Sequence, residues 1–425
     1  MIKKTIIFTL LVFLSSGAFS QDIRKLQETF IEAEYFVLYQ EYNDALPFYL
    51  QLYEQLPDNA NIAFRIGLCY LNITGWKNLA ISYLETAAKN CSANYKEGSL
   101  NQKTAPYEAI FHLGEAYRIN FQFDKAKESF IRYRETLLPD DKENLRFLDQ
   151  QIQVCDNAVE LISKPVKFTE ENMGSLINDE RSNHSPIVSA DHKSFAYMVS
   201  LKFYDAIMYS KLVNNKWSAP LNITPEIQVD GSVSISSLSS DGNTIYLSKN
   251  DNFSSDLYSA QFKEGRWTPA VLLNKNINTK YWESHGYTSE NGEIIIFASD
   301  RPGGFGGLDL YISKKVNGDW GPAVNLGPEI NTPFNEDRPF LINGTKTLFF
   351  CSQGHYNMGG YDIFRSDLQT NGLWSEPSNL GYPLNTPDDD TFFSPVEKGE
   401  GGYISKSKGT SDNFGREDIY RITLK

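Results

Sequence analysis

Tryptophans in the second half of the chain recur at a nearly constant interval, and this interval constrains the fold more than any other feature of the sequence. Consecutive members of the series are 50, 53 and 54 residues apart, at Trp217, Trp267, Trp320 and Trp374. Each is followed by a small residue and Pro or Ala, in WSAP, WTPA, WGPA and WSEP. A period near 50 residues with about four short strands per unit is typical of a β-propeller blade.

A second repeated position sets the number of blades. An aromatic residue recurs in a strand of each unit, at Tyr209, Tyr258, Tyr311, Phe364 and Tyr420. Four of the five follow an Asp by two positions, whereas the first copy has Ile207 there. The motifs resemble the WD40-like repeats of TolB-type propellers, most clearly in SDRPGGFGGLDLYIS and SSDGNTIYLSKNDNFSSDLYSA. The repeats predict a five-bladed β-propeller over residues 164–425.

The last blade is incomplete at the carboxyl end, where the chain stops with IYRITLK. Residues 166–178, VKFTEENMGSLIN, match the missing outer strand and its turn, because Asn178 precedes Pro186 by the interval that separates Asn331 from Pro339. An unpaired edge strand exposes backbone groups that closure of the ring would satisfy. The sequence therefore predicts that a strand at 166–170 completes the fifth blade.

The first half, residues 22–163, has apolar residues at helical spacing and few Gly or Pro residues. Ile66, Gly67 and Tyr70 recur as Leu113, Gly114 and Tyr117. With LGEAYRINFQFDKAKESF as its clearest copy, this half resembles the tetratricopeptide repeat, interrupted by an insertion at 91–104. The resemblance implies an α-solenoid whose concave groove holds peptides or helices of partner proteins. Tyr70 and Tyr117 are the partner-binding residues expected there.

The amino terminus predicts export. Lys3 and Lys4 precede an apolar stretch, and SSGAFS leads to a cleavage point before Gln21, so residues 1–20 have the form of a signal peptide. Loss of this segment shifts the formal net charge from −13 to about −15, which disfavours nucleic acid as a partner. No transmembrane segment is expected in the mature chain. We expect a periplasmic protein.

The cysteine, histidine and acidic residues are the remaining candidates for a metal, disulfide or binding site. The spacing of the four cysteines does not match a metal site; they are Cys69, Cys91, Cys155 and Cys351. A disulfide between two of the first three is an alternative that the sequence leaves open. His184, His285 and His355 stand in unlike contexts, and no metal or cofactor is expected. Acidic residues precede several innermost strands and could form a ring at the channel mouth that binds a cation or a basic peptide, or they could be solvated turn carboxylates. They are Glu283, Glu336, Asp337, Asp389 and Asp390.

Catalysis is not expected. Five-bladed propellers that cleave glycans need an acid paired with a nucleophile or base, whereas the acidic residues here repeat from blade to blade. No nucleophile elbow, zinc-protease motif or phosphate loop is present. We therefore predict no catalytic residues.

The combination of helical repeats and propeller is similar to periplasmic subunits of type IX secretion and OmpA-associated assemblies, without the OmpA-like domain that usually follows. This resemblance implies a non-catalytic scaffold for envelope or outer-membrane proteins. The alternative is a glycan-binding or glycan-cleaving propeller with accessory helices.

Overall fold

The structure, a computed structural model, describes residues 23–202, 204–229, 232–250, 254–396, 399–407 and 417–425. The expected signal peptide at 1–20 lies outside these residues. The chain divides into two compact units, Met1–Leu148 and Asp149–Lys425. The division falls inside helix α7 (Lys142–Ser163) and not at the end of that helix, where the sequence placed it. No disulfide joins any of the four cysteines, all of which lie within the described residues.

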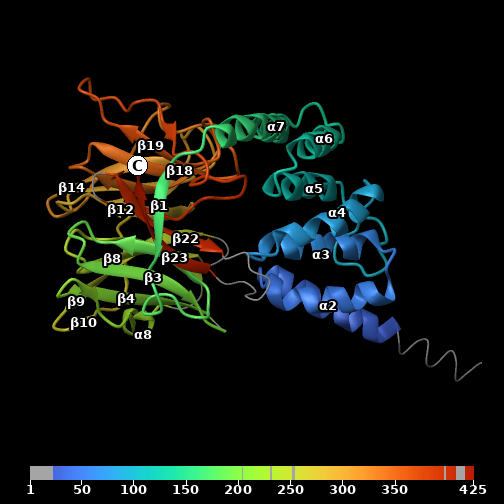
Figure 1. Ribbon diagram of the computed structural model, residues 1–425, viewed down its shortest axis with the longest axis horizontal. Coiled ribbons are helices and arrows are strands. Elements are labelled where there is room, and N and C mark those ends of the chain that lie inside the picture. Colours follow the sequence, from blue (N-terminus) through green and yellow to red (C-terminus); the bar gives the residue numbers. More distant parts are fainter. Residues whose placement is uncertain (1–22, 203, 230–231, 251–253, 397–398, 408–416) are drawn as a thin grey trace, which may run out of the picture. The chain divides into compact units, whose positions relative to one another are not determined.

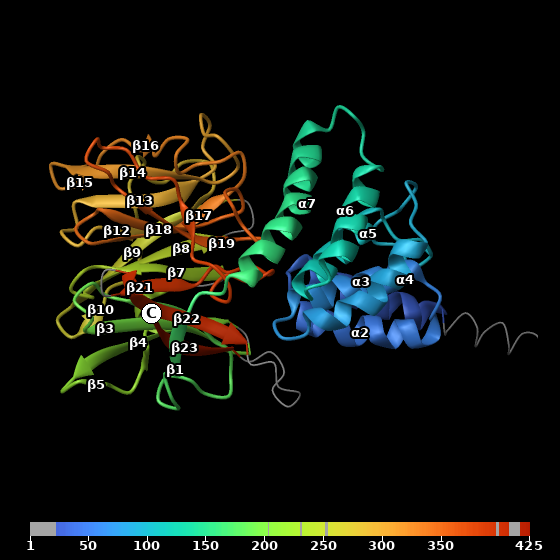
Figure 2. The ribbon, with the colours of Figure 1, turned by 45° about the horizontal axis from the view of Figure 1, so that its top comes forward.

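The first unit is a series of antiparallel helices, most of which pack against the next helix along the chain (Figure 2). Two glycines permit the closest approaches. A Cβ atom on Gly67 would lie 2.5 Å from Cγ of Leu84, and one on Gly114 would lie 2.6 Å from Cε1 of Phe130. The series consists of a helix at 23–38, α2 (Tyr42–Gln55), α3 (Ala60–Asn72), the 3₁₀ turn η1 (Lys77–Leu79), α4 (Ala80–Lys89), α5 (Glu108–Ile119), α6 (Phe123–Arg134) and the start of α7.

The second unit is a five-bladed β-propeller. Each blade is an antiparallel sheet of four or five strands, and the innermost strands of neighbouring blades contact one another around a central channel. In chain order, the first blade consists of β2 (Asn183–Val188), β3 (Ser194–Ser200), β4 (Asp205–Val213), β5 (Lys216–Trp217) and β6 (Leu221–Asn222), and the second of β7 (Ser232–Leu238), β8 (Thr244–Asn250), β9 (Ser255–Lys263), β10 (Arg266–Trp267) and β11 (Val271–Leu272). The third blade consists of β12 (Glu283–Thr288), β13 (Ile294–Ser299), β14 (Asp309–Val316), β15 (Asp319–Trp320) and β16 (Val324–Asn325), and the fourth of β17 (Glu336–Ile342), β18 (Thr347–Ser352), β19 (Asp362–Asp367) and β20 (Ser378–Asn379). The fifth blade consists of β21 (Phe393–Val396), β22 (Gly401–Ser407), β23 (Glu417–Leu424) and β1 (Phe168–Asn172).

The fifth blade joins the two ends of the propeller sequence. Strand β1 pairs antiparallel with β23, with Phe168 opposite Leu424 and Asn172 opposite Tyr420. Figure 1 shows β1, in green, beside the red strands of the carboxyl end. The closing strand thus begins and ends two residues later than the segment 166–170. Because β1 supplies the outer edge, the last blade is as complete as the others.

The part of α7 that belongs to the second unit lies against the fourth blade. Nε2 of Gln150 donates to Oδ1 of Asn357 at 2.9 Å and to the Gly354 carbonyl at 2.9 Å. Nδ2 of Asn157 donates to the Asn357 carbonyl at 3.0 Å. These bonds explain why the division between the units falls within α7. None of the described helices is long and apolar enough to cross a membrane.

Candidate functional site

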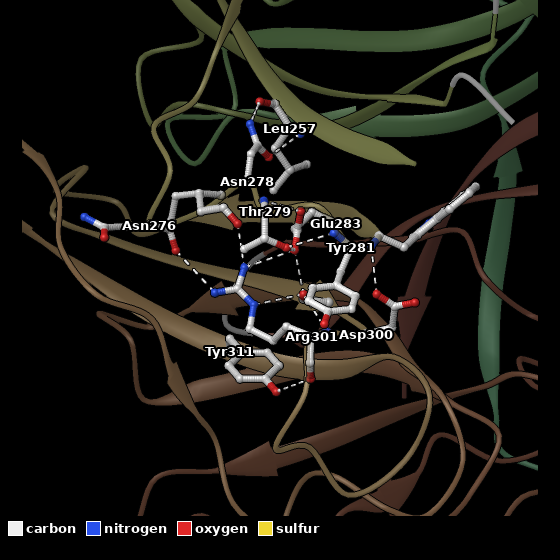
Figure 3. Close-up of polar contacts among 12 residues, drawn as sticks. Leu257, Asn276, Asn278, Thr279, Tyr281, Glu283, Asp300, Arg301 and Tyr311 are labelled. Carbon is white, nitrogen blue, oxygen red and sulfur yellow. Dashed lines mark hydrogen bonds and ion pairs between the residues drawn. The ribbon is translucent and has the colours of Figure 1, made fainter. Parts of the chain in front are cut away.

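Repeated asparagines join each blade to the next. Asn278, at the turn before β12, accepts from the Leu257 N–H and donates to the Leu257 carbonyl, both at 2.8 Å, and Leu257 belongs to the preceding blade (Figure 3). The equivalent asparagines Asn331, Asn385 and Asn178 bind the backbone of Leu310, Ile363 and Ile419 in the same way. The asparagine that the sequence showed repeating is therefore an interblade clamp, and the copy at Asn178 clamps β23.

Two of the predicted mouth residues are buried clamps of a second kind. Glu283 is fully buried and accepts from Oγ1 of Thr279 at 2.7 Å and from Oγ of Ser299 at 2.8 Å. It also pairs with Nη2 of Arg301 at 3.2 Å, as Figure 3 shows. Glu336 is likewise fully buried and accepts from Thr332 and Ser352, but no arginine pairs with it among the described residues. Burial raises the pKa of Glu336 to about 7.

Asp390 and Asp389, two further predicted mouth residues, also accept hydrogen bonds from backbone N–H groups. Asp390 accepts from the N–H and hydroxyl of Thr386, and burial with nearby Asp362 raises its pKa well above the usual range. Asp389 is exposed and accepts from the Tyr361 N–H at 2.9 Å. Most of these carboxylates therefore stabilise turns and strand ends, because their side chains point into the blade. They do not form an acidic ring around an open mouth.

The two predicted groove tyrosines are buried between helices. Tyr70 is 8% exposed, and its ring packs against those of Trp76 and Tyr83. Tyr117 is 7% exposed and donates to Oε1 of Glu85 at 2.5 Å. The aromatic rings fill the space between neighbouring helices, so neither residue lines an open groove.

The insertion between α4 and α5 covers one side of α3. Tyr95 donates to Oδ1 of Asn61 at 2.8 Å, Glu97 lies 3.6 Å from Nη2 of Arg65, and the Lys103 carbonyl accepts from the Ala60 N–H at 3.0 Å. As a result, Asn61 and Arg65 are buried although they are polar. The chain itself therefore occupies this face of the helical unit.

The innermost strands of four blades each contain a β-bulge. The strand pairing shifts between His184 and Ile187, between Ile235 and Ser237, between Glu283 and Gly286, and between Asp337 and Phe340. A bulge re-aims the side chain of the extra residue. Residues at these bulges line a small cavity in the central channel together with Phe392, which precedes the innermost strand of the fifth blade. They are Ser185, Ser236, His285 and Arg338.

Backbone strain accompanies two of the bulges. Ser185 has φ +53° and Arg338 has φ +51°, in the left-handed region that residues other than glycine rarely adopt. Such conformations cost free energy and persist where the surrounding structure enforces them. Here they occur at equivalent positions of two blades.

Asp337 organises the charged groups at the cavity. Its carboxylate accepts from Oγ of Ser284 at 2.6 Å and lies 3.1 Å from Nδ1 of His285. Burial opposes ionisation of Asp337, but His285 and Arg338 outweigh it and hold its pKa at about 2. Burial and Arg338 lower the pKa of His285. The imidazole is therefore neutral at pH 7, with its Nδ1 proton directed to Asp337 and Nε2 left as an acceptor.

The inner end of the cavity is apolar. Ile187, Ile235, Phe340 and Phe393 line it and are buried. The Phe340 ring packs against Tyr287 with centroids 4.9 Å apart, and Tyr287 lines a separate pocket farther along the channel. Phe340 lines both pockets.

Sequence reasoning identified Asp337, which lies beside the cavity, but it assigned no role to the polar residues that line the cavity. The bulge positions hold Ser in two blades, His in a third and Arg in a fourth, so no residue type common to all four marks them. No group of three or more His, Cys, Asp or Glu residues within the described ranges could hold a metal ion.

Comparison with known proteins adds similarity at the level of the fold. No protein-family model matches the chain, and no curated protein matches it. TolB from Acinetobacter baumannii is 15% identical over 68% of this chain and 71% of that chain, with a TM-score of 0.35. An α-L-arabinofuranosidase from Lactobacillus brevis is 14% identical over 58% and 92%, with a TM-score of 0.35. The catalytic domain of the Coprinopsis cinerea GH62 α-L-arabinofuranosidase is 10% identical over 61% and 98%, with a TM-score of 0.37. The propeller assignment rests on the strand pairing of the chain itself.

Proposed function

We propose that the protein is a non-catalytic scaffold of the bacterial envelope, exported to the periplasm and associated with outer-membrane proteins. In this proposal the helical unit is a tetratricopeptide-type array that holds a protein partner, and the propeller is a second interaction module. The observation that carries the proposal is an exposed apolar surface on the first described helix.

This surface, called here the first-helix stripe, consists of Ile31, Tyr35, Leu38 and Tyr39. Their exposed fractions are 59%, 55%, 76% and 53%. The first three recur at helical spacing on one face of the helix at 23–38, and the Tyr35 and Tyr39 rings lie 5.0 Å apart. Terminal helices of a repeat array need a polar outer face to remain soluble alone. A clustered apolar face therefore favours a partner protein with a complementary apolar surface.

The tetratricopeptide assignment is supported by the close contacts at Gly67 and Gly114. Each glycine lies where the next helix places a large side chain, Leu84 or Phe130. Such contacts are those that small residues permit between paired helices. Because the insertion covers α3, the proposal moves the partner site from Tyr70 and Tyr117 to the first-helix stripe.

The chemistry of the channel supports a non-catalytic role. None of the described residues that line the cavity is acidic. Asp337, the carboxylate nearest to the lining, is held by Ser284, His285 and the Arg338 N–H. Glycoside hydrolysis by the usual route needs two carboxyl groups across the scissile bond.

The test is capture of partners from envelope extract with the wild-type mature chain and two charge variants. Leu38→Glu places a charge in the first-helix stripe. Leu221→Glu is the matched control, because Leu221 is 67% exposed but lies on a propeller strand. We expect a stoichiometric protein partner with wild type and Leu221→Glu, and loss of at least tenfold of the captured amount with Leu38→Glu. Equal capture by all three chains would refute the stripe as the partner site.

A parallel assay separates the scaffold from the glycan-acting alternative. The same chains are applied to a glycan array and incubated with envelope polysaccharides, and released reducing sugar is measured. Saturable glycan binding or sugar release that is unaffected by Leu38→Glu would overturn the scaffold proposal.

A further inference from the structure

The channel cavity contains polar groups that the fold does not use. Nε2 of His285 and Oγ of Ser236 are buried and have no hydrogen-bond partner among the described residues. His285 is 9% exposed and Ser236 is 4% exposed. Buried polar atoms are nearly always paired in native proteins, so each such atom needs an explanation. Both belong to residues that line the same cavity.

Arg338 adds an unpaired positive charge. Its guanidinium carbon lies 4.0 Å from the centroid of the Phe392 ring, and no ion pair within the described ranges joins it to a carboxylate. Burial lowers the pKa of Arg338, although the nearby Asp337 opposes this effect. Asp337 offsets part of this charge, but its oxygens are occupied by Ser284, His285 and the Arg338 N–H.

We propose that the channel cavity binds a carboxylate group, which Arg338 pairs and Ser236 and His285 hydrogen-bond. A planar guanidinium matches the geometry of a carboxylate. A singly charged anion suits the site better than a phosphate, because Asp337 lies beside it. This site is independent of the first-helix stripe.

The apolar inner end indicates what the carboxylate is attached to. Ile187, Ile235, Phe340 and Phe393 can surround a short aliphatic chain but offer it no polar partner. A short aliphatic acid therefore matches the chemistry of this lining. The carboxyl terminus of a peptide carries the same group, and it can enter from the side where Arg338, Thr391 and Phe392 are partly exposed.

Occupancy should change the protonation of His285. The charged groups that face this imidazole are Asp337 and Arg338, both on β17. A bound anion would oppose the effect of Arg338, so it would raise the pKa of His285 and allow Nε2 to donate. Carboxylate binding should then be tighter at pH 6 than at pH 8.

The first experiment is calorimetric titration of the mature chain with butyrate, with butyramide as the uncharged analogue. We expect saturable binding of butyrate and none of butyramide. Arg338→Met should weaken binding at least tenfold, whereas Arg338→Lys should retain part of it. Arg365→Met is the matched control, because Arg365 also packs over a phenylalanine ring but lies on β19. Unchanged affinity in Arg338→Met overturns the proposal.

A second measurement keeps the proposal testable if Arg338→Met does not fold. The wild-type chain has five histidines, so its imidazole proton resonances can be followed by NMR and that of His285 assigned with His285→Gln. Saturating ligand should raise the pKa of His285 by about one pH unit, a tenfold linkage between binding and protonation. A short peptide acid and its amide are tested alongside butyrate. A shift with butyrate indicates a free acid, and a shift with only the peptide acid indicates a chain terminus. No shift with either ligand overturns the proposal.

Discussion

Glu336 should make the propeller less stable as the pH rises, and Glu336→Gln should remove that dependence. The carboxyl group is fully buried, and its pKa is about 7 in the folded protein compared with the usual 4.5. The folded state therefore holds a proton that the unfolded state has released. The stabilising contribution is complete below about pH 4.5 and is lost as the pH rises through about 7.

The size of the effect follows from the pKa difference. At roughly 1.4 kcal/mol for each pH unit, the difference corresponds to about 3 kcal/mol in the free energy of unfolding. Gln keeps an acceptor oxygen for the Thr332 N–H, and its amide can donate to the hydroxyls of Thr332 and Ser352. It carries no charge at any pH, so the cost of burying a carboxylate disappears.

The assay is urea unfolding at several values between pH 5 and pH 8, followed by tryptophan fluorescence. Five of the six tryptophans lie in the propeller, and Trp76→Phe in both chains removes the sixth. Burial raises the pKa of Asp390 and lowers that of His285, but both groups are present in both chains. Their contributions therefore cancel in the difference between wild type and Glu336→Gln.

We expect wild type to lose about 2.5 kcal/mol relative to Glu336→Gln between pH 5 and pH 8, because part of the full difference is already lost at pH 5. Glu293→Gln, at an exposed position before β13, should follow the wild-type profile. Parallel profiles for wild type and Glu336→Gln would refute the reasoning, because they would show that Glu336 holds no additional proton in the folded state.

Three further perturbations test the clamps, the closure and the helix packing. Asn331→Ala removes both bonds to the Leu310 backbone and should lower the urea midpoint by the equivalent of about 2 to 3 kcal/mol, whereas Asn371→Ala in an exposed turn should cost little. A chain ending at Ser407 lacks β23 and leaves β1 without its partner. Its propeller should no longer unfold cooperatively, as measured by tryptophan fluorescence. A transition as sharp as that of the full chain would contradict the closure. Gly114→Ala places a methyl group against Phe130 and should destabilise the helical unit by about 1 to 3 kcal/mol, measured by circular dichroism, with Glu128→Ala on the exposed face of α6 as the control.

The repeat period predicted the propeller because each blade needs the same local devices. A turn asparagine must bind the neighbouring strand, and an aromatic residue must fill the same space in every blade. These requirements place the same residue types at a fixed interval in the sequence. For this reason the copy at Asn178 identified the segment that closes the ring. The helical half was equally regular at Gly67 and Gly114, where the next helix leaves no room for a side chain.

The direction of individual side chains could not be predicted from that regularity. The sequence placed Glu283 and Glu336 at the start of innermost strands, but only the paired strands show that both point into the blade. It placed Tyr70 and Tyr117 on repeated helices, but contacts with neighbouring helices bury both. A pattern gives the face of an element, whereas burial depends on what packs against that face.

The sequence by itself thus determined the two kinds of domain, the number of blades and the segment that closes the ring, because these follow from repeated local bonding. Tertiary structure alone decided the channel site. Bulges turn Ser236, His285 and Arg338 toward one cavity, although they come from three blades and share no motif. Their association depends on strand register around a closed ring, which is a non-local property that no short stretch of sequence encodes.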